Sequence, residues 1–225
     1  MRNKLMLVPA FVSALVLGAA AQTPAPAPAG QNAPPAAPAL GPNQWAIDGS
    51  HTTAGFSVKH MMVTNVHGSF GKVSGTIDYD GKDVSSIAAD ITIDATSINT
   101  NNERRDTHLK SPDFFDVANH PTITFKSKRV QKASDGKFAL VGDLTMHGVT
   151  KEVALDVEGP APVINAGRVF KTGASAMTTI NRQDFGLKWN RALEAGGVTV
   201  GDQVKIVLEI EANQPNPNAP PPSSR

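Results

Sequence analysis

The sequence predicts an all-β fold in which about eight antiparallel strands close into a barrel. Apolar and polar residues alternate over most of the region 44–213, which is the period of half-buried strands. Turn signals such as Asp80-Gly81 and Asp135-Gly136 separate these runs at short intervals, as they do between antiparallel neighbours. Closure into a barrel is expected because closure alone removes exposed sheet edges.

The expected strands follow one another closely along the chain. The N-terminal half contributes alternating runs at 44–48, 55–60, 73–79 and 87–95. The C-terminal half contributes runs at 123–125, 138–146, 153–157, 168–180 and 204–210, of which the run at 168–180 is the weakest. Two short helices are also expected, at 111–116, which begins with a serine and a proline, and at 190–195, which two glycines follow.

The stretch 98–125 interrupts the alternation. It has no period of two, and it concentrates charged and aromatic side chains. Among them are Arg104, Arg105, His108, Phe114 and Phe115. We expect this stretch to lie at one mouth of the barrel and to help decide what enters.

The chain is expected to contain a signal peptide, a linker, one domain and a tail. Residues 1–21 show basic residues, an apolar run and three alanines, the order of a secretory signal peptide. The apolar run is too short to span a bilayer, so cleavage after Ala21 is expected. Residues 22–43 and 214–225 are rich in proline and are expected to be disordered. The segment 44–213 has the size of one domain.

Composition excludes several classes of protein. The chain contains no cysteine, which rules out disulfides, thiolate metal sites and a lipoprotein anchor. Removal of the signal peptide takes away two of the 21 basic residues and leaves a net charge of −1 with neutral histidines. This balance lacks the basic surface that nucleic acid binding requires. We expect an exported protein, with the periplasm as first choice and secretion as second.

Eight short motifs occur in a specific order along the expected domain. They are Asp48-Gly-Ser-His51, Phe56-Ser-Val-Lys-His60, Gly68-Ser-Phe-Gly71, Ile93-Asp-Ala-Thr-Ser-Ile-Asn-Thr100, Arg105-Asp-Thr-His-Leu-Lys-Ser-Pro-Asp-Phe-Phe-Asp116, His120-Pro-Thr-Ile-Thr-Phe125, Gly142-Asp-Leu-Thr-Met-His-Gly-Val-Thr150 and Ile180-Asn-Arg-Gln-Asp-Phe-Gly-Leu187. With these motifs the chain resembles the YceI-like family of periplasmic polyisoprenoid-binding proteins. The resemblance covers Trp45 to Asn213 and implies a lipocalin-like, extended barrel with an elongated apolar tunnel.

The resemblance implies that the tunnel holds a polyprenyl derivative or an isoprenoid quinone, for storage or transport. Small inward-facing residues, such as Gly75, Ala89 and Gly142, fit both an open cavity and a filled, tapered barrel, and the resemblance favours the cavity. The residues expected to line the tunnel are Phe56, Val58, Ile91, Ile93, Phe125, Leu144, Met146 and Phe185.

A polar lipid head would need hydrogen-bond donors near the mouth. The residues expected to contact it are Arg104, Arg105, His108, Phe114 and Phe115. Arg105 directly precedes Asp106, and such a pair more often holds a loop together than it binds a ligand. Arg104 is therefore the better candidate of the two arginines.

Two other functions stay open beside lipid carriage: an enzyme acting on the lipid head, metal-dependent through His60, His67 or His108, and a stress-response barrel with a filled lumen. No two of the six histidines lie two to four residues apart, so we predict no metal site, although a site joined from distant strands stays open. No catalytic residue is predicted, and no cofactor besides the bound isoprenoid lipid. Transient contact with a membrane surface is expected, and a homodimer is left open.

Overall fold

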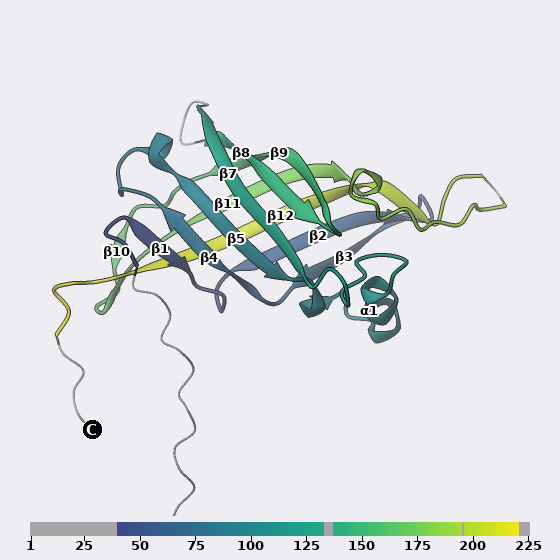
Figure 1. Cartoon of the computed structure of the whole chain (residues 1–225), viewed down its shortest axis with the longest axis horizontal. Helices are drawn as coiled ribbons and strands as arrows, with labels where there is room; N and C mark the ends of the chain where they lie inside the picture. The colour runs from purple at the N-terminus through teal and green to yellow at the C-terminus, as the bar shows by residue number, and fades with distance from the viewer. Residues whose placement is uncertain (1–39, 133–136, 195, 221–225) are drawn as a thin grey trace, which may run out of the picture. The chain divides into compact units, whose positions relative to one another are not determined.

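The computed structural model describes residues 40–132, 137–194 and 196–220. In this part of the chain, twelve strands form one antiparallel sheet, accompanied by one α-helix and three short 3-10 helices (Figure 1). The expected signal peptide, most of the linker and the end of the tail lie outside the described residues.

The strands are β1 (Gln44–Ile47), β2 (Thr53–His60), β3 (Thr64–Phe70), β4 (Val73–Asp78), β5 (Ala88–Asp94), β6 (Ile98–Asn99), β7 (Thr122–Lys132), β8 (Lys137–Met146), β9 (Val149–Glu158), β10 (Ile164–Asn165), β11 (Val169–Asn181) and β12 (Val200–Pro215). The helical elements are α1 (Glu103–Lys110), η1 (Val84–Ser86), η2 (Ala95–Ser97) and η3 (Arg182–Phe185).

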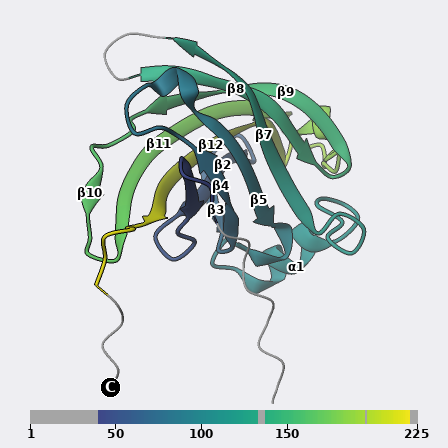
Figure 2. The same ribbon diagram turned by 60° about the vertical axis from the view of Figure 1, so that its left-hand side comes forward.

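The sheet closes into a barrel of eight strands. Hydrogen-bonded neighbours follow the order β11–β9–β8–β7–β5–β4–β1–β12, and β12 pairs with β11 to complete the ring. The closing pair is long, with thirteen residue pairs from Val169↔Pro215 to Asn181↔Gln203. Figure 2 shows the strands curving around a common interior. The predicted all-β barrel is confirmed.

One edge of β12 is long enough to pair with two different strands. Its C-terminal part pairs with β1 at Ala212 and Asn213. Its N-terminal part pairs with β2 between Val200 and Glu209, and β3 and β6 extend the sheet beyond β2. The interior is therefore elongated along β12.

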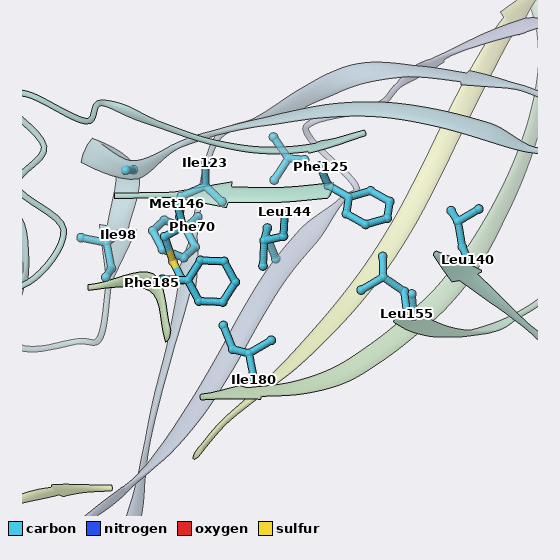
Figure 3. Packing of buried hydrophobic residues seen from close by; sticks show 14 of the residues in the cluster. Phe70, Ile98, Ile123, Phe125, Leu140, Leu144, Met146, Leu155, Ile180 and Phe185 are labelled. Atoms are coloured by element: carbon cyan, nitrogen blue, oxygen red, sulfur yellow. The ribbon is translucent and has the colours of Figure 1, made fainter. Parts of the chain in front are cut away.

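The alternating apolar residues of the sequence form the core. In β8, Phe138, Leu140, Leu144 and Met146 are buried, as a period of two predicts for one face of a strand. They belong to one large cluster of buried side chains, part of which is shown in Figure 3. A second, smaller cluster surrounds Trp45 on β1.

The helix within the irregular stretch lies earlier than predicted. Residues 111–116, expected as a helix, form hydrogen-bonded turns that follow α1. The side chain of Asn102 caps α1 by accepting a hydrogen bond from the backbone N–H of Arg105 at 3.0 Å. Pro112 explains the end of α1, since it disfavours helical backbone at Ser111, which is extended at φ −74° and ψ 170°. No helix among the described residues has both the length and the apolar character needed to cross a bilayer.

Two further segments differ from their sequence predictions. The described residues of the helix expected at 190–195 form a loop instead, in which Ala192 and Val198 make an isolated β-bridge. Two glycines after this segment adopt positive φ, which suits a turn of the loop. β12 continues to Pro215, two residues beyond the expected domain boundary, because it stays paired with β11.

Candidate functional site

An apolar cavity runs along the interior of the barrel. Val200 and Ala212 both line it, and they lie twelve residues apart on β12, or roughly 40 Å along the strand at about 3.3 Å per residue. The cavity volume is about 230 Å³. Spread over this length, it forms a narrow bore that fits one long chain better than a compact ligand.

The wall of the cavity contains few polar groups. Besides apolar residues and one glycine, the lining contains five threonines, Tyr79 and Arg182. The indole N–H of Trp45 donates a hydrogen bond to the backbone oxygen of Tyr79 at 3.0 Å, so it needs no partner in the cavity. Burial raises the pKa of Tyr79, and the nearby charges of Asp80 and Asp83 raise it further. The phenol is therefore neutral at physiological pH, and Arg182 is the only charged residue of the lining.

Seven of the eight residues predicted to line a tunnel face this cavity. They are Phe56, Val58, Ile91, Ile93, Phe125, Leu144 and Met146. Phe185 is the exception, since it is 2% exposed and packs within the surrounding core (Figure 3). The seven lie on strands, where alternation identifies the inward face, whereas Phe185 lies in η3, where that period does not apply. Contact of these side chains with a ligand stays a prediction.

Two phenylalanines of the wall lie over glycines of neighbouring strands. Phe56 is paired with Gly68 across β2 and β3, and a Cβ atom at Gly68 would collide with the Phe56 ring. A Cβ atom at Gly142 would lie 2.7 Å from Cζ of Phe125. Because these glycines have no side chain, the two rings rest against the backbone and leave the bore open.

Strand pairing fixes the end of the cavity near β1. Trp45 is 3% exposed and lines this end, and its strand pairs with β4 on one edge and β12 on the other. Next to β1, Nζ of Lys171 lies 2.5 Å from a carboxylate oxygen of Glu211 and 3.4 Å from one of Asp48. This end is held by backbone hydrogen bonds and by an ionic network.

The other end of the cavity is bounded by side chains from outside the sheet. Leu109 of α1 lines the cavity together with Phe114 and Phe115 from the turns that follow. The Phe115 ring meets the ring of Phe70 edge-on at 5.6 Å between centroids. The Phe114 ring lies 5.3 Å from the ring of Trp189, which precedes β12. These aromatic contacts place the predicted mouth segment against the barrel.

This mouth segment, residues 102–120, carries its own backbone hydrogen bonds. Among the described residues, each backbone-to-backbone hydrogen bond that the segment makes joins two of its own members. Its contacts with the barrel are therefore made by side chains. Such a segment can shift without breaking a strand pair, which is what a movable mouth requires.

Arg104 and Arg105 differ in their surroundings. Nε and Nη2 of Arg105 donate hydrogen bonds to the hydroxyl and backbone oxygens of Thr100, both at 2.7 Å. Asp106 accepts a hydrogen bond from the backbone N–H of Thr100 at 2.9 Å. Arg105 and Asp106 thus both bind Thr100, and these bonds hold α1 to the preceding segment of the chain. The two residues do not form an ion pair with each other in the described structure. Arg104 is exposed, and its side chain makes no hydrogen bond or ion pair with the described residues.

His108 is held by a carboxylate and two aromatic rings. Its Nε2 lies 2.8 Å from a carboxylate oxygen of Asp113. Its ring meets Phe114 and Trp189 edge-on, at centroid distances of 5.1 and 4.9 Å. His108 therefore joins the mouth segment to the loop before β12.

A buried arginine that the sequence did not single out lies at the same end. Arg182 is 3% exposed, and burial lowers its pKa. Its guanidinium donates hydrogen bonds to the backbone oxygens of Leu187, Trp189, Val200 and Gly201 and to a carboxylate oxygen of Asp202. All five of its N–H groups thus have protein partners. Arg182 holds the loop before β12 and offers no free donor to a ligand. It lies in the motif 180–187, but that motif does not by itself indicate that the arginine is buried.

The fold also brings together two histidines that are distant in sequence. The rings of His120 and His147 lie 4.9 Å apart between centroids. Potential ligand atoms of these histidines and of Asp116 lie within 4.8 Å of one another. The prediction of no metal site rested on histidine spacing along the chain, which cannot reveal a pair formed by folding.

Known proteins share this architecture. The YceI-like domain matches residues 45–212. A UPF0312 protein of Staphylococcus aureus is 41% identical over 168 residues, which cover 74% of this chain and 95% of that protein. The crystal structure of a YceI protein of Campylobacter jejuni aligns with a TM-score of 0.58 at 32% identity, over 70% of this chain and 90% of that one.

Two more distant structures share the fold. BcnA of Burkholderia cenocepacia aligns with a TM-score of 0.61 at 22% identity, over 73% of this chain and 98% of that one. A polyisoprenoid binding domain from Saccharophagus degradans aligns with a TM-score of 0.56 at 17% identity, over 76% and 98%. Since the domain match spans nearly all of the barrel and a relative is 41% identical over the same length, the chain belongs to the YceI-like family.

Proposed function

We propose that this protein is a carrier that holds one long isoprenoid lipid inside its barrel, for storage or transport. The observation that carries the proposal is the narrow apolar cavity, whose single charged residue is fully occupied by protein partners. The binding class named for the Saccharophagus degradans domain supports the same kind of ligand. A polyprenyl derivative and an isoprenoid quinone both meet the requirement, because each combines a long apolar chain with one polar head.

Removal of apolar surface from water provides the affinity in this proposal. Each Å² of buried apolar surface contributes about 25 cal/mol, so each isoprene unit inside the bore adds to the binding free energy. Affinity should therefore rise with chain length until the bore is filled and then level off.

The head group of the lipid belongs at the mouth segment in this proposal. Arg104 is exposed there with no protein partner among the described residues, and His108, Phe114 and Phe115 lie nearby on the same segment. Arg105 stays a predicted head-group contact, but Thr100 already accepts hydrogen bonds from its Nε and Nη2. Arg104 is thus the main candidate for a charged head.

Binding is better supported than catalysis. An enzyme acting on the lipid head through His60, His67 or His108 would need these residues to meet a reactive group or a metal. None of the three belongs to a group of potential metal ligands in the described part of the chain. A stress-response barrel with a filled lumen is disfavoured by the open cavity.

The proposed location of the carrier is the periplasm. The N-terminal pattern of basic residues, an apolar run and three alanines supports export, and the lack of cysteine suits an oxidising compartment. A carrier in that compartment has to take up its lipid from a membrane.

The turn between β2 and β3 is the proposed point of contact with the membrane. Met61, Met62 and Val63 are 46%, 54% and 80% exposed, so three apolar side chains project at one turn. Both methionines adopt positive φ, at 48° and 59°, a conformation that usually selects glycine or asparagine. Figure 1 shows this turn at the same end of the barrel as α1. Flotation with lipid vesicles tests the contact with the membrane. If the turn is instead buried in a homodimer, the protein should not bind the vesicles.

The carrier proposal is tested by purification from the protein's own cell envelope under gentle conditions. Mass spectrometry of the organic extract should find one isoprenoid lipid per chain. Added lipid should change the fluorescence of Trp189 in the Trp45→Phe variant, because Trp189 touches the mouth segment. A lumen without lipid, together with no binding of polyprenols of any length, would sink the carrier proposal.

A further inference from the structure

Asp116, His120 and His147 form a cluster that the lipid-carrier function does not use. Asp116 and His120 lie in the turn that leads into β7, and His147 lies in the turn between β8 and β9. All three residues are half-buried, and their potential ligand atoms lie within 4.8 Å of one another. Metal–ligand bonds of about 2.0–2.2 Å to nitrogen and oxygen need only a small inward movement from this spacing.

Backbone and side-chain hydrogen bonds orient the carboxylate of Asp116. The backbone N–H of His120 donates to the backbone oxygen of Asp116 at 2.8 Å and closes the turn. The amide of Asn119 donates to Oδ2 of Asp116 at 2.8 Å. This bond fixes the carboxylate and leaves Oδ1 available. No lysine or arginine of the described chain forms an ion pair with Asp116, so the negative charge lacks a cationic partner there.

The tautomer of His147 suits a metal ligand. Its Nδ1 lies 3.2 Å from the backbone oxygen of Phe185, which can only accept a hydrogen bond. Nδ1 therefore carries the proton, and Nε2 presents its lone pair. A backbone oxygen bound to the far nitrogen is the usual outer partner of a metal-bound histidine.

Two glycines leave room for the imidazole rings. A Cβ atom at Gly148 would lie 2.8 Å from Cε1 of His120, and one at Gly186 would lie 2.9 Å from Nδ1 of His147. Both glycines also adopt positive φ, at 73° and 81°, which favours glycine. The same two glycines therefore allow the turns to form and leave space for the imidazole rings.

A second cluster of potential ligand residues in the described chain differs in its charge balance. Asp48, His51 and Glu211 also bring potential ligand atoms close together. The ammonium of Lys171 already lies among them, 2.5 Å from Glu211 and 3.4 Å from Asp48. That cluster is neutralised by a cation of the protein, whereas the cluster at His147 is not.

We infer that Asp116, His120 and His147 bind a divalent transition metal ion. Two imidazoles and one carboxylate are a donor set for zinc, iron or cobalt, and three protein ligands leave a coordination position open. The metal would join the end of the mouth segment to the β8–β9 turn. Met146 and Leu187, which lie next in sequence to His147 and Gly186, line the cavity, so the metal would sit just outside its wall.

The experiment uses the full chain, stripped with a chelator and then titrated with Zn²⁺ alone or Co²⁺ alone. We expect one ion per chain, a visible Co²⁺ absorption band, and a Tm increase of about 5–10 °C at a hundredfold excess over Kd. His120→Ala and His147→Ala should each weaken Zn²⁺ binding at least about tenfold and abolish the Co²⁺ band.

His51→Ala, in the second cluster, is the matched control and should bind Zn²⁺ like the wild type. If either histidine variant fails to fold, Asp116→Asn provides the test instead. It keeps the shape of the side chain, and it should weaken Zn²⁺ binding because it removes the carboxylate. The inference is wrong if the stripped protein takes up no ion, or if His120→Ala binds as tightly as wild type. It is also wrong if His51→Ala is the variant that loses the ion. Because every readout is made without lipid, failure here leaves the carrier proposal untouched.

Discussion

The two ends of the barrel close the same cavity by different means. At the β1 end, Trp45 lies on a strand that is hydrogen-bonded on both edges. At the α1 end, the wall comes from Leu109, Phe114 and Phe115, which belong to a segment with no backbone hydrogen bond to the barrel among the described residues. Opening the first end requires breaking a strand ladder, whereas opening the second requires only the separation of side chains.

For the proposed lipid carrier, this difference predicts the direction of lipid entry. Segments that rest on side-chain contacts open at lower free energy than paired strands do. The ring contacts of the mouth segment, from Phe114 to Trp189 and from Phe115 to Phe70, are worth about 0.5–1.5 kcal/mol each beyond their buried area. Lipid should therefore enter and leave at the α1 end, with its chain running toward Trp45.

The largest effect is expected when the α1 end loses Arg182. Arg182→Ala leaves four backbone oxygens without their hydrogen-bond donor, and at about 1–3 kcal/mol for a buried group the free energy of unfolding should fall by at least about 3 kcal/mol. Urea unfolding measures this loss. Hydrogen exchange should locate it in residues 187–202 and leave β1 and β4 protected.

The exposed Arg191 of the same loop provides the control, because Arg191→Ala removes an equal side chain without buried bonds. Its unfolding free energy should match that of the wild type. An Arg182→Ala protein that lost protection equally at both ends would contradict the separation between them.

The bore between the two ends is tested by Gly68→Ala. The new methyl group collides with the Phe56 ring and with Cγ2 of Thr100, and displacement of the Phe56 ring into the cavity would narrow the bore. We expect about a tenfold loss of affinity for a long polyprenol, with overpacking costing about 1–3 kcal/mol of stability. Titration with polyprenols of increasing length measures the affinity.

Gly55→Ala is the matched control for this change. Gly55 lies on the same hairpin, and its Cβ atom would meet nothing closer than 3.4 Å. Its affinity should stay within twofold of wild type, about 0.4 kcal/mol on the thermodynamic scale. Equal losses in both variants would show that the hairpin matters and the width of the bore does not.

The barrel wall could be predicted from the sequence because it follows a local rule. Alternation places Ile91, Ile93, Leu144 and Met146 on the inward face. A shift of the strand register by one residue would turn every side chain of the strand to the opposite face, so the burial of one face fixes the register. The alternation rule does not apply outside the strands, where capping signals predict the helix at 111–116. That prediction is wrong because Ser111 and Pro112 mark the end of α1, where Pro112 disfavours helical backbone at Ser111.

The features that the sequence could not predict depend on contacts between distant segments. Arg182 is buried because backbone oxygens of residues 187–201 converge on it, and nothing local marks that convergence. His120 and His147 meet because the turn before β7 lies beside the β8–β9 turn. The spacing of residues along the chain predicts neither the burial of Arg182 nor the contact between His120 and His147.

A smaller effect is expected from the exposed charge at the mouth. Arg104→Ala should weaken binding of a polyprenyl diphosphate about threefold and leave the neutral polyprenol unchanged, since an exposed ion pair contributes under about 1 kcal/mol. Arg168 is an exposed arginine just before β11, and Arg168→Ala is the control, which should change neither affinity. Equal weakening of both lipids would remove Arg104 from the head-group site.

The smallest effect is expected from Asp48, beside the ladder of the β1 end. Hydrogen bonds from Ser50, His51 and Asn213 hold the pKa of Asp48 well below its usual range. Because the folded state binds this proton more weakly than the unfolded chain does, the carboxylate stabilises the fold above a pH of about 4, and the contribution is lost as the pH falls. Asp48→Asn should therefore be less stable than the wild type at pH 7, and the difference should shrink as the pH drops below about 4.

Thermal unfolding between pH 3 and pH 7 measures this convergence, with the exposed Asp184→Asn at the other end as control. Lipid affinity at pH 7 should be unchanged in Asp48→Asn, because the proposed entrance lies at the α1 end and not at the end that Asp48 holds. A variant that kept its stability but lost lipid uptake would place the entrance at the β1 end. In that case the pairing of β1 with β4 and β12 would have to open to admit the lipid.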